Sequence, residues 1–472
     1  ESVSSTSGAI VVVDSAGDPS PAGVVVVVSV GASVGSGVES TEDELSPHEA
    51  ANVATATMLT SANRPRESRC DIGQSYPAAV QRFDLIIIGA GSGNSVIGPE
   101  HDDWKIAIVE RGLFGGTCLN VGCIPSKMFV FAAEVAELAR RGPELGVQTR
   151  FEGADWPAIR DRVFGRIDPI AEGGEDYRRG LDHVTVFNDD ARFVGPNELT
   201  VGGETITADT IVLAAGARAN VPPIPGIETV GFDTSDSIMR VDALPERLIV
   251  LGGGYIAAEL GAVFGSLGSE VTYVLRGDAM LREQDHEISA RMTKIYGERF
   301  RTHRNADIQS VERDADGDVV LHLADGETVR GDRLLVATGR IPNGDQLGVA
   351  ATGVELDDAG YVISDSHGRT NVDGIWTLGD ITNPVQLKHV ANHEAKIVAH
   401  NIANPDDLRA MNHDFIPAAV FSHPQIGTVG LTEQQCNDRG LDYTAHVQDY
   451  ASAAAGWAME DTESACKLIM DN

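Results

Sequence analysis

The stretch GGTCLNVGCIPSK, residues 115–127, places two cysteines, Cys118 and Cys123, five positions apart between glycine-containing turns. Residues five apart on an ideal α-helix are rotated by roughly 140° about its axis, so the two sulfurs can meet only where the helix is interrupted. The flanking glycines permit that interruption. Two buried thiols or a structural disulfide are the alternatives, but a pair directly after a nucleotide-binding unit favours redox chemistry.

That upstream unit is an apolar segment followed by a glycine turn, FDLIIIGAGSGN, residues 83–94. We expect a strand, a tight turn at Gly89 and Gly91 that lets a pyrophosphate approach the amides of a helix N-terminus, the helix, and a second strand. Asn94 replaces the third glycine of the motif, and a purely structural turn is the alternative. Glu110, at the end of the second strand, is placed to accept hydrogen bonds from ribose hydroxyls.

A second unit of this kind occupies residues 247–275, RLIVLGGGYIAAELGAVFGSLGSEVTYVL. Its turn contains Gly252, Gly254 and Ala257, a form whose small last residue allows close packing of helix on strand. Arg276 stands where a carboxylate would bind a free ribose hydroxyl, and Arg282 follows closely. Guanidinium groups suit the 2′-phosphate of NADPH, so we expect NADPH rather than NADH; two solvated surface arginines are the alternative.

The composition restricts the partners. The chain has 472 residues, 70 acidic against 36 basic, and a net charge of −34, which repels nucleic acid phosphates. Lysine is scarce and the acidic residues cluster, which is typical of adaptation to high salt; an ordinary acidic protein is the alternative. No apolar run has the length of a membrane span. Five scattered cysteines favour a cytoplasmic enzyme with one catalytic pair, and we expect no metal site.

From Phe83 onward the chain resembles the class I pyridine nucleotide–disulfide oxidoreductases. The resemblance covers about four-fifths of the sequence, and within the family it is strongest to the mycothione reductases. The segments that carry it include GSGNS, CIPSKMFVFAAEVAE, VFGRIDPIAEGGEDYRR, RTHRN, GRIPNGD, QLKHVANHEA and GWAMEDT. The resemblance implies FAD and NADPH as cofactors, a small disulfide as substrate, and a homodimer.

The resemblance also implies roles for individual residues. Lys127 and Glu259 would form an ion pair near flavin N5, Cys123 would lie next to the flavin, and Cys118 would exchange with substrate. Gly339 would border the nicotinamide nucleotide. The residues that would contact FAD are Gly89, Gly91, Glu110, Gly116, Thr117, Lys127, Gly216, Asp380, Gln386, Leu387, Lys388 and His389.

The predicted fold is α/β, with two Rossmann-like FAD- and NAD(P)-binding domains and a truncated C-terminal α+β interface domain. Residues 1–82 are Ser-, Gly-, Ala- and Val-rich, and we expect a low-complexity, disordered extension with Met58 as a candidate start. The expected limits are 1–82 for this extension, 83–225 and 346–410 for the FAD-binding domain, 226–345 for the NADPH-binding domain and 411–472 for the interface domain.

The catalytic base is missing from the expected set. The resemblance implies a histidine in a His-Pro-x-x-x-x-Glu segment of the other subunit, and His423-Pro424 has no glutamate at that spacing. We therefore expect a C-terminal segment beyond Asn472. Rival substrates are bis-γ-glutamylcystine and dihydrolipoamide, the latter disfavoured by Arg276. A flavin-binding module without turnover is the rival of another class.

Overall fold

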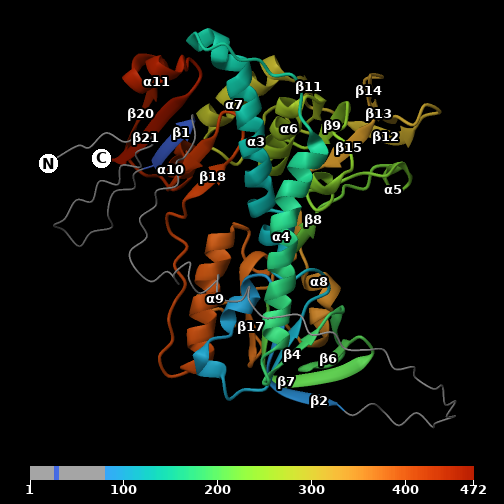
Figure 1. Cartoon of the computed structure of the whole chain (residues 1–472). Helices are drawn as coiled ribbons and strands as arrows, with labels where there is room; N and C mark the ends of the chain where they lie inside the picture. The colour runs from blue at the N-terminus through green and yellow to red at the C-terminus, as the bar shows by residue number, and fades with distance from the viewer. Residues whose placement is uncertain (1–25, 31–79) are drawn as a thin grey trace. The chain divides into compact units, whose positions relative to one another are not determined.

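The computed structural model describes residues 26–30 and 80–472. Met58, Cys70 and the other residues of the expected extension at positions 1–25 and 31–79 lie outside these ranges. Within them, the chain forms three main sheets with helices packed against them (Figure 1).

The first sheet is built on the apolar segment before the first glycine turn. Strand β2 (Gln81–Ile88) pairs in parallel with β3 (Ile106–Val109) and β7 (Glu204–Leu213). Ile86 and Ile88 enter one buried cluster while Leu85 and Ile87 enter another, so both faces of the strand are covered, as in the parallel sheets of α/β proteins. The other strands of this sheet are β4 (Val184–Phe187), β5 (Ala191–Phe193), β6 (Glu198–Val201) and β17 (Ile375–Thr377).

The prediction of a helix directly after the first glycine turn is wrong. The structure has only two 3-10 helices there, η1 (Ser92–Val96) and η2 (Pro99–His101). Pro99 explains the difference, because proline lacks an N–H and disfavours the α conformation of the residue before it. A phosphate at this turn would therefore meet turn amides rather than the end of a long helix.

Two long helices follow the cysteine stretch. The short helix α2 (Gly116–Asn120) is succeeded by α3 (Cys123–Arg141), η3 (Gly142–Leu145) and α4 (Trp156–Arg179). The buried Trp156 ring stacks on Phe129 of α3 at 5.0 Å between centroids, and its Nε1 donates to the Val241 carbonyl at 2.7 Å. This aromatic contact fastens α3 to α4, which lie side by side in Figure 1.

The second sheet contains the second glycine turn. Its parallel strands run in the order β11-β10-β9-β15, and a three-stranded antiparallel sheet, β12-β13-β14, accompanies it. Helix α6 (Tyr255–Leu267) follows β9 directly, as the sequence predicts, and it packs on α3. The other elements are β9 (Arg247–Leu251), β10 (Glu270–Val274), α7 (His286–Arg299), β11 (Arg301–His303), β12 (Ile308–Arg313), β13 (Val319–Leu323), β14 (Thr328–Gly331) and β15 (Arg333–Val336).

A two-stranded ladder joins the segments that leave and re-enter the first sheet. Strand β8 (Ala217–Ala219) pairs antiparallel with β16 (Arg340–Pro342), directly after Gly216 and Gly339 respectively. The returning chain then reaches β17 and helix α9. These and the nearby short elements are α5 (Ile227–Val230), η4 (Ile238–Arg240), α8 (Gly344–Leu347), η5 (Val349–Ala351), η6 (Gly379–Ile381) and α9 (Lys388–Ala403).

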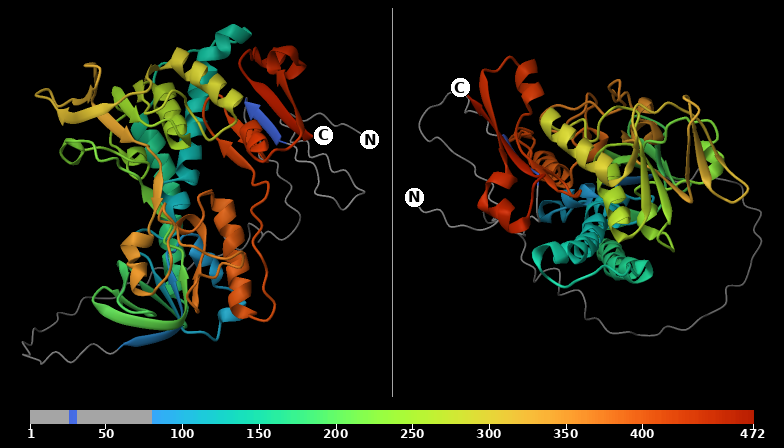
Figure 2. Two further views of the ribbon diagram at one scale, coloured as in Figure 1. Left: turned by 180° about the vertical axis from the view of Figure 1, so that it is seen from behind. Right: turned by 90° about the horizontal axis from the view of Figure 1, so that it is seen from above.

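The third sheet has the order β18-β19-β1-β21-β20. Strand β1 (Val26–Val30) pairs antiparallel with β19 and β21, beside which it lies in both views of Figure 2. These five residues form a strand where the sequence predicted a disordered extension. Valine is enriched in strands, which accounts for the difference. The remaining elements are β18 (Ala418–Val420), β19 (Ile426–Thr428), α10 (Glu433–Asp438), β20 (Tyr443–Asp449), η7 (Tyr450–Ser452), α11 (Ala454–Met459) and β21 (Ala465–Asp471).

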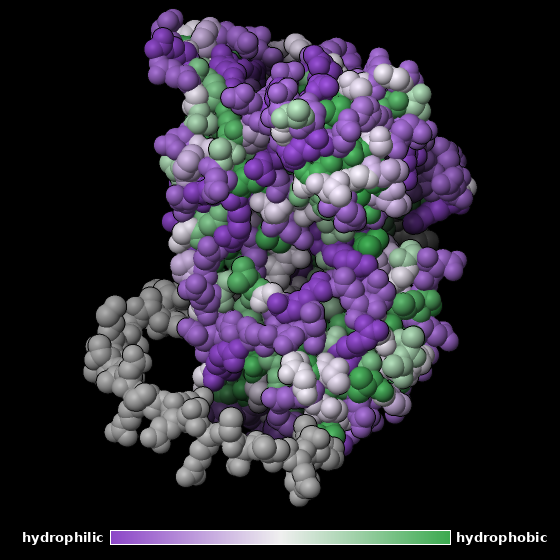
Figure 3. Space-filling view, turned by 90° about the vertical axis from the view of Figure 1, so that its right-hand side faces the viewer, coloured by the Kyte–Doolittle hydropathy of each residue, from purple (hydrophilic) through white to green (hydrophobic). Residues whose placement is uncertain are grey.

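One face of α3 carries apolar side chains with no cover from the described residues. Phe131, Val135 and Leu138 recur at helical spacing, and each is more than half exposed. The segment Gly116–Leu145 is, within the described residues, the one helical segment long and apolar enough to cross a membrane by length and composition alone. In contrast, hydrophilic residues predominate on the face shown in Figure 3.

Candidate active site

The two cysteines lie on either side of a break in the helix. Cys118 belongs to α2 and Cys123 begins α3, while Val121 and Gly122 between them have non-helical angles (φ −143°, ψ 14° and φ −131°, ψ −120°). A Cβ on Gly122 would lie 2.9 Å from the Thr117 carbonyl oxygen, so a side chain there would collide with the turn. The interruption predicted from the cysteine spacing is present.

The two cysteine side chains are hydrogen-bonded to each other, and this bond shifts their pKa values in opposite directions. The hydrogen bond from Cys118 lowers the pKa of the Cys123 thiol to about 7 against partial desolvation, and the charge of Lys127 assists. The same hydrogen bond, together with burial and the Cys123 charge, raises the pKa of Cys118 well above its usual range. Cys123 therefore carries the thiolate of the pair.

Asn120 holds the loop that precedes the break. Its side-chain amide donates to the carbonyls of Phe114 at 2.8 Å and Gly116 at 3.1 Å. Gly116 in turn meets the first glycine turn, because a Cβ on it would lie 2.7 Å from the Cα of Gly91. Thr117, exposed on α2, lies next to this contact. The cysteine loop and the first glycine turn are thus in direct backbone contact.

The first glycine turn is braced from both sides. Gly89 has φ +108°, and a Cβ there would lie 2.3 Å from the Ala214 carbonyl oxygen. The Glu110 carboxylate accepts the N–H groups of Ala90 and Gly112, each at 2.8 Å. These bonds fix the carboxylate at the end of β3 while leaving each of its oxygens a further lone pair for a hydroxyl donor.

Arg178 is a residue that sequence reasoning missed. From the end of α4 it donates through Nε to Asn94 Oδ1 at 2.8 Å and through Nη2 to the Asn94 carbonyl at 2.9 Å. Asn94 is the residue that replaces the third glycine of the first motif, so this bidentate clamp explains the departure. Burial lowers the pKa of Arg178, which has no carboxylate partner among the residues the structure describes.

Lys127 and Glu259 form an ion pair between α3 and α6. The Lys127 Nζ lies 2.8 Å from Glu259 Oε2, and the other carboxylate oxygen accepts the Phe421 N–H at 2.9 Å. The Lys127 ammonium also lies 4.1 Å from the centre of the Phe421 ring. The pair therefore joins the cysteine helix, the second nucleotide unit and the start of the third region.

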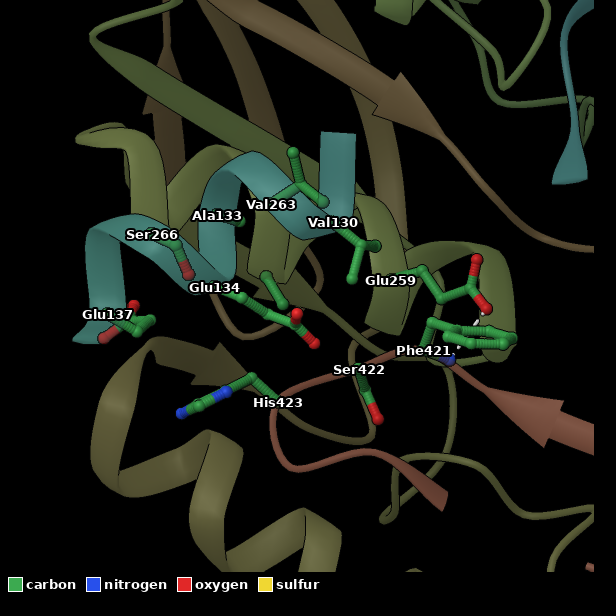
Figure 4. A pocket seen from close by; sticks show the side chains of 11 residues that line it. Val130, Ala133, Glu134, Glu137, Glu259, Val263, Ser266, Phe421, Ser422 and His423 are labelled. Carbon is green, nitrogen blue, oxygen red and sulfur yellow. Dashed lines mark hydrogen bonds between the residues drawn. The ribbon is translucent and has the colours of Figure 1, made fainter. Parts of the chain in front are cut away.

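A small pocket lies behind this pair, between α3, α6 and the segment from Phe421 to His423 (Figure 4). In Figure 4, Glu259 and Phe421 lie at one end and His423 and Glu137 at the other. Burial raises the pKa of Glu134 and lowers that of His423, whose charged neighbours are Arg299, Glu137, Arg141 and Asp461. His423 therefore faces groups other than the cysteines.

Asp380 lies in a buried acidic turn ahead of α9. Burial raises its pKa, with a contribution from Glu394, while Arg340 and Lys388 oppose the rise. Glu394, itself buried, accepts the N–H of Gly379 at 2.6 Å and His413 Nε2 lies 2.8 Å from it. The turn is consequently held in one position by a carboxylate from the following helix.

The residues at the start of α9 face different surroundings. Gln386 adopts a left-handed backbone (φ +51°) and donates to the Tyr361 hydroxyl at 3.2 Å. Leu387 is the N-cap residue and Lys388 the first helical residue, with its Nζ 2.9 Å from Ser92 Oγ of the first turn. His389 is exposed. The structure thus brings this helix start and the first glycine turn together.

The second glycine turn has the geometry of a nucleotide site. Gly252 has φ +124°, and a Cβ there would lie 2.2 Å from the Ala337 carbonyl oxygen. A Cβ on Gly254 or Gly339 would meet nothing within 4 Å, which leaves open space for a ligand against the backbone. Ala257 is fully buried, and its carbonyl accepts the Tyr273 hydroxyl at 3.2 Å. Here the small residue permits close packing of α6 on β10.

Three exposed arginines lie beyond β10. Arg276 and Arg282 are both solvent-exposed, and neither has an ion-pair partner within residues 80–472. Arg304, which sequence reasoning did not single out, joins them because Asn305 donates to the Gly277 carbonyl at 2.9 Å. The RTHRN segment was the available signal. Uncompensated guanidinium groups at this position suit a phosphate.

The residues present fit a flavin dinucleotide at the first turn. Gly216, at φ +64°, has nothing within 4 Å of an added Cβ, so its backbone borders open space as Gly254 and Gly339 do. The first turn adds the fixed Glu110 carboxylate, and the cysteine loop contacts this turn through Gly116 and Gly91. No group of three His, Cys, Asp or Glu side chains in the described part of the chain is placed to hold a metal ion.

Comparison with known proteins agrees with this arrangement. A family model described as pyridine nucleotide-disulphide oxidoreductase matches residues 83–395, and the dimerisation-domain model of that family matches residues 416–472. The mycothione reductase of Mycobacterium tuberculosis (strain CDC 1551 / Oshkosh) is 45% identical over 405 residues, covering 83% of this chain and 87% of that protein.

More distant relatives include other reductases. The mercuric reductase of Staphylococcus aureus is 34% identical over 403 residues, covering 82% of this chain and 72% of that protein. Among solved structures, the Cu(II) complex of the HOCl-induced flavoprotein disulfide reductase RclA from Escherichia coli matches with a TM-score of 0.73 and 26% identity, covering 83% of this chain and 87% of that one.

Proposed function

The chain belongs to the pyridine nucleotide-disulphide oxidoreductase family, and from this premise we propose that it uses NADPH to reduce mycothione. It is a flavoprotein disulfide reductase that uses FAD and a nicotinamide nucleotide. The choice of NADPH and of mycothione is the proposal. A cytoplasmic location is part of it, which the few scattered cysteines favour.

The observation that carries the proposal is the contact between Cys118 and Cys123 at the start of α3, with the thiolate on Cys123. Bound FAD would supply two-electron transfer from the nicotinamide to this pair. Two electrons and one proton convert the Cys118–Cys123 disulfide into a thiol and a thiolate. Cys123, next to Lys127, is assigned to the flavin side, and Cys118 is the thiol that exchanges with substrate.

Reduction of the substrate then takes two thiol–disulfide exchange steps. Cys118 loses its proton to a base, and its thiolate attacks one sulfur of the substrate disulfide, releasing a thiolate that takes up a proton. The Cys123 thiolate then attacks Cys118 in this mixed disulfide, which restores the Cys118–Cys123 bond and releases a second thiolate that takes up a proton from solvent. Because the hydrogen bond with Cys123 raises the pKa of Cys118, the first step requires a base.

In this proposal, the following residues are assigned to FAD and NADPH. Gly89 and Gly91 would let the pyrophosphate approach, Glu110 would accept from the ribose, and Asp380 would hold the ribityl chain. Gly216 and the start of α9 complete the site, and Lys127 with Glu259 borders the flavin. For NADPH, Gly252, Gly254 and Ala257 form the pyrophosphate turn, Gly339 borders the nicotinamide, and Arg276 and Arg282 bind the 2′-phosphate. The proposed domain limits remain those expected from the sequence.

Mycothione is preferred on the similarity to a mycothione reductase, which exceeds that to the mercuric reductase. The test is turnover by purified protein with NADPH and either mycothione, bis-γ-glutamylcystine or glutathione disulfide, and with NAD and dihydrolipoamide. We expect the highest kcat/KM with mycothione and NADPH. Faster turnover of another disulfide, or of dihydrolipoamide with NAD, would identify that compound as the substrate in place of mycothione. Bound FAD without any turnover would favour a binding module.

A homodimer is proposed, with the apolar face of α3 at its interface. The C-terminal end of α3 contacts the region that matches the dimerisation domain, since Arg141 donates to the Met459 carbonyl at 2.6 Å. A second copy would cover Phe131, Val135 and Leu138, which the described residues leave exposed. The variant Leu138→Asp should shift the protein to a monomer in sedimentation, whereas Val194→Asp, an exposed apolar control outside α3, should not.

A further inference from the structure

The carboxylate of Glu394 holds both ends of the turn that contains Asp380. Glu394 lies on α9 and is 1% exposed. Its Oε2 accepts the N–H of Gly379 at 2.6 Å, and its Oε1 accepts the side-chain amide of Asn383 at 2.7 Å. The turn also closes on itself, because the Asn383 N–H donates to the Gly379 carbonyl at 2.9 Å. One buried carboxylate therefore fixes the backbone on either side of Asp380.

A third donor reaches Glu394 from the surface of the molecule. His413 Nε2 lies 2.8 Å from Glu394 Oε1 and 3.2 Å from the amide nitrogen of Asn383. A carboxylate oxygen accepts hydrogen bonds and an amide nitrogen only donates them, so we assign the hydrogen of this contact to Nε2. The His413 side chain is 41% exposed. The pair thus connects an exposed residue to the buried Asp380 turn.

The segment that carries His413 is anchored to α9 and to a neighbouring loop. Asn401, fully buried on α9, accepts the N–H of Arg409 at 2.7 Å and donates to the Arg409 carbonyl at 2.9 Å. The N–H of Met411 donates to the Ser366 carbonyl at 2.7 Å. These anchors lie four and two residues before His413. They restrict the positions that its ring can take.

The three donors to Glu394 are not equivalent. Gly379 and Asn383 offer neutral N–H groups, whereas His413 forms an ion pair with the carboxylate when its ring is protonated. A buried carboxylate that loses a charged partner is costly, because water does not replace that partner. Both remaining donors belong to the Asp380 turn. Without His413, the carboxylate gains most by moving toward water, and the turn would move with it.

We propose that His413 is a positioning residue that acts through Glu394 to hold the Asp380 turn in the position that binds FAD. The inference rests on the proposed assignment of Asp380 to the ribityl chain. It adds to that assignment a residue of the connection between α9 and β18, outside the segments expected to contact the cofactor. The contribution of His413 is to the lifetime of bound FAD.

The test follows the release of FAD from the purified holoprotein by the rise in flavin fluorescence, with neither NADPH nor a disulfide present. His413→Ala should increase the release rate about tenfold, the effect of losing a hydrogen bond between charged groups. His413→Gln, whose amide can donate to the same oxygen, should stay within about threefold of the original protein. If His413→Ala fails to fold, His413→Phe, which keeps a ring without the donor, takes its place.

An exposed histidine on α9 provides the matched control. His393 directly precedes Glu394 in the chain and is exposed, so His393→Ala should leave the release rate unchanged. Where a variant is purified without FAD, its dissociation constant, obtained by adding FAD to the protein, replaces the rate.

A double variant decides whether His413 acts through Glu394. Glu394→Gln removes the charge of the carboxylate and should itself increase FAD release. Adding His413→Ala to Glu394→Gln should then change the rate less than about twofold, because the partner of His413 is already lost. A further tenfold increase would show that His413 acts independently of Glu394, which would overturn the proposal.

The remaining outcomes separate this inference from the proposed function. An unchanged rate in His413→Ala, an equal increase in His393→Ala, or no rescue by His413→Gln overturns the role of His413. Failure of the original protein to reduce mycothione with NADPH would refute the substrate and leave the comparison of release rates intact, since FAD release requires neither compound.

Discussion

The Nζ of Lys127 and the Oε2 of Glu259 lie 2.8 Å apart although 132 positions separate the two residues in the chain. Glu259 is almost fully buried, and its second oxygen is occupied by the Phe421 amide. One carboxylate thereby positions the cysteine helix, the second nucleotide unit and the third region together.

Replacing Lys127 by Met should leave this buried carboxylate without its charged partner. We expect the free energy of unfolding to fall by about 2 kcal/mol, the usual worth of a hydrogen bond between charged groups, and disulfide turnover to fall with it. Denaturant unfolding and steady-state kinetics measure the two. Lys294→Met, which breaks an exposed pair with Glu298, should change neither the stability nor the turnover. An equal effect of both substitutions would show that the Lys127–Glu259 pair contributes no more than an exposed pair.

The ionisation of Cys123 predicts a spectral pH dependence. Its pKa of about 7 means that the thiolate beside oxidised flavin is present above that pH and lost as pH falls through it. The long-wavelength absorbance of the two-electron-reduced enzyme should follow this titration. Cys118→Ala removes the hydrogen bond that lowers the pKa and should move the midpoint upward, whereas Cys118→Ser, which keeps a donor, should move it less. Loss of the band in Cys118→Ser would reverse the assigned roles.

Arg276 is expected to select NADPH. Replacing it by Met should raise KM for NADPH about tenfold with little change for NADH, since the lost guanidinium contact concerns only the 2′-phosphate. Arg301, exposed on β11, provides the control substitution. Parallel changes in both KM values would indicate a structural role for Arg276.

The Arg178–Asn94 clamp should support FAD binding. Arg178→Met removes both hydrogen bonds to Asn94 and should increase the rate of FAD release about tenfold. The rise in flavin fluorescence measures this rate. Asn94→Gly in the same chain restores the usual third glycine. If Arg178 acts only by holding Asn94, the double variant should regain FAD; continued release would mean that the guanidinium charge itself acts on the cofactor.

Lys467 joins α7, α10 and β21 through the buried carboxylate of Asp285 and the partly exposed carboxylate of Glu433. Its Nζ lies 2.7 Å from Asp285 and also contacts Glu433, with Lys467 and Asp285 each 1% exposed. Lys467→Met should destabilise the protein by about 3 to 5 kcal/mol, because Asp285 would remain buried and charged. Adding Asp285→Asn should recover part of that loss in thermal unfolding. Additive losses in the double variant would contradict the pairing.

The stability that this ion-pair network contributes should depend on pH. Although burial opposes it, hydrogen bonds from Lys467 and two backbone amides lower the pKa of Asp285. A carboxyl group whose pKa is depressed on folding adds stability above its unfolded value, near 3.9, and that stability is lost as pH falls through the folded value. The benefit of Lys467 should thus be full at neutral pH and vanish in strong acid, as unfolding curves of the original and Lys467→Met proteins would show.

The sequence by itself determined the local elements whose geometry depends on near neighbours. Glycine at positions 89 and 252 allows left-handed turns that no side chain would fit, and the spacing of Cys118 and Cys123 requires a broken helix. Apolar runs on either side then specify the two nucleotide-binding units. Pro99 was equally visible, and its effect on the first helix follows from its chemistry, although the motif suggested otherwise.

Only the tertiary structure decided which distant charges meet. Arg178 reaches Asn94, Lys388 reaches Ser92, and Lys467 reaches Asp285, across 84, 296 and 182 positions. A charged side chain has no periodic pattern that reveals its partner, because its energy depends on burial and on the groups that the folded chain brings within a few ångströms. The sequence motif therefore identifies the redox pair. The charges that surround the pair depend on how the helices and sheets pack, so the motif does not predict them.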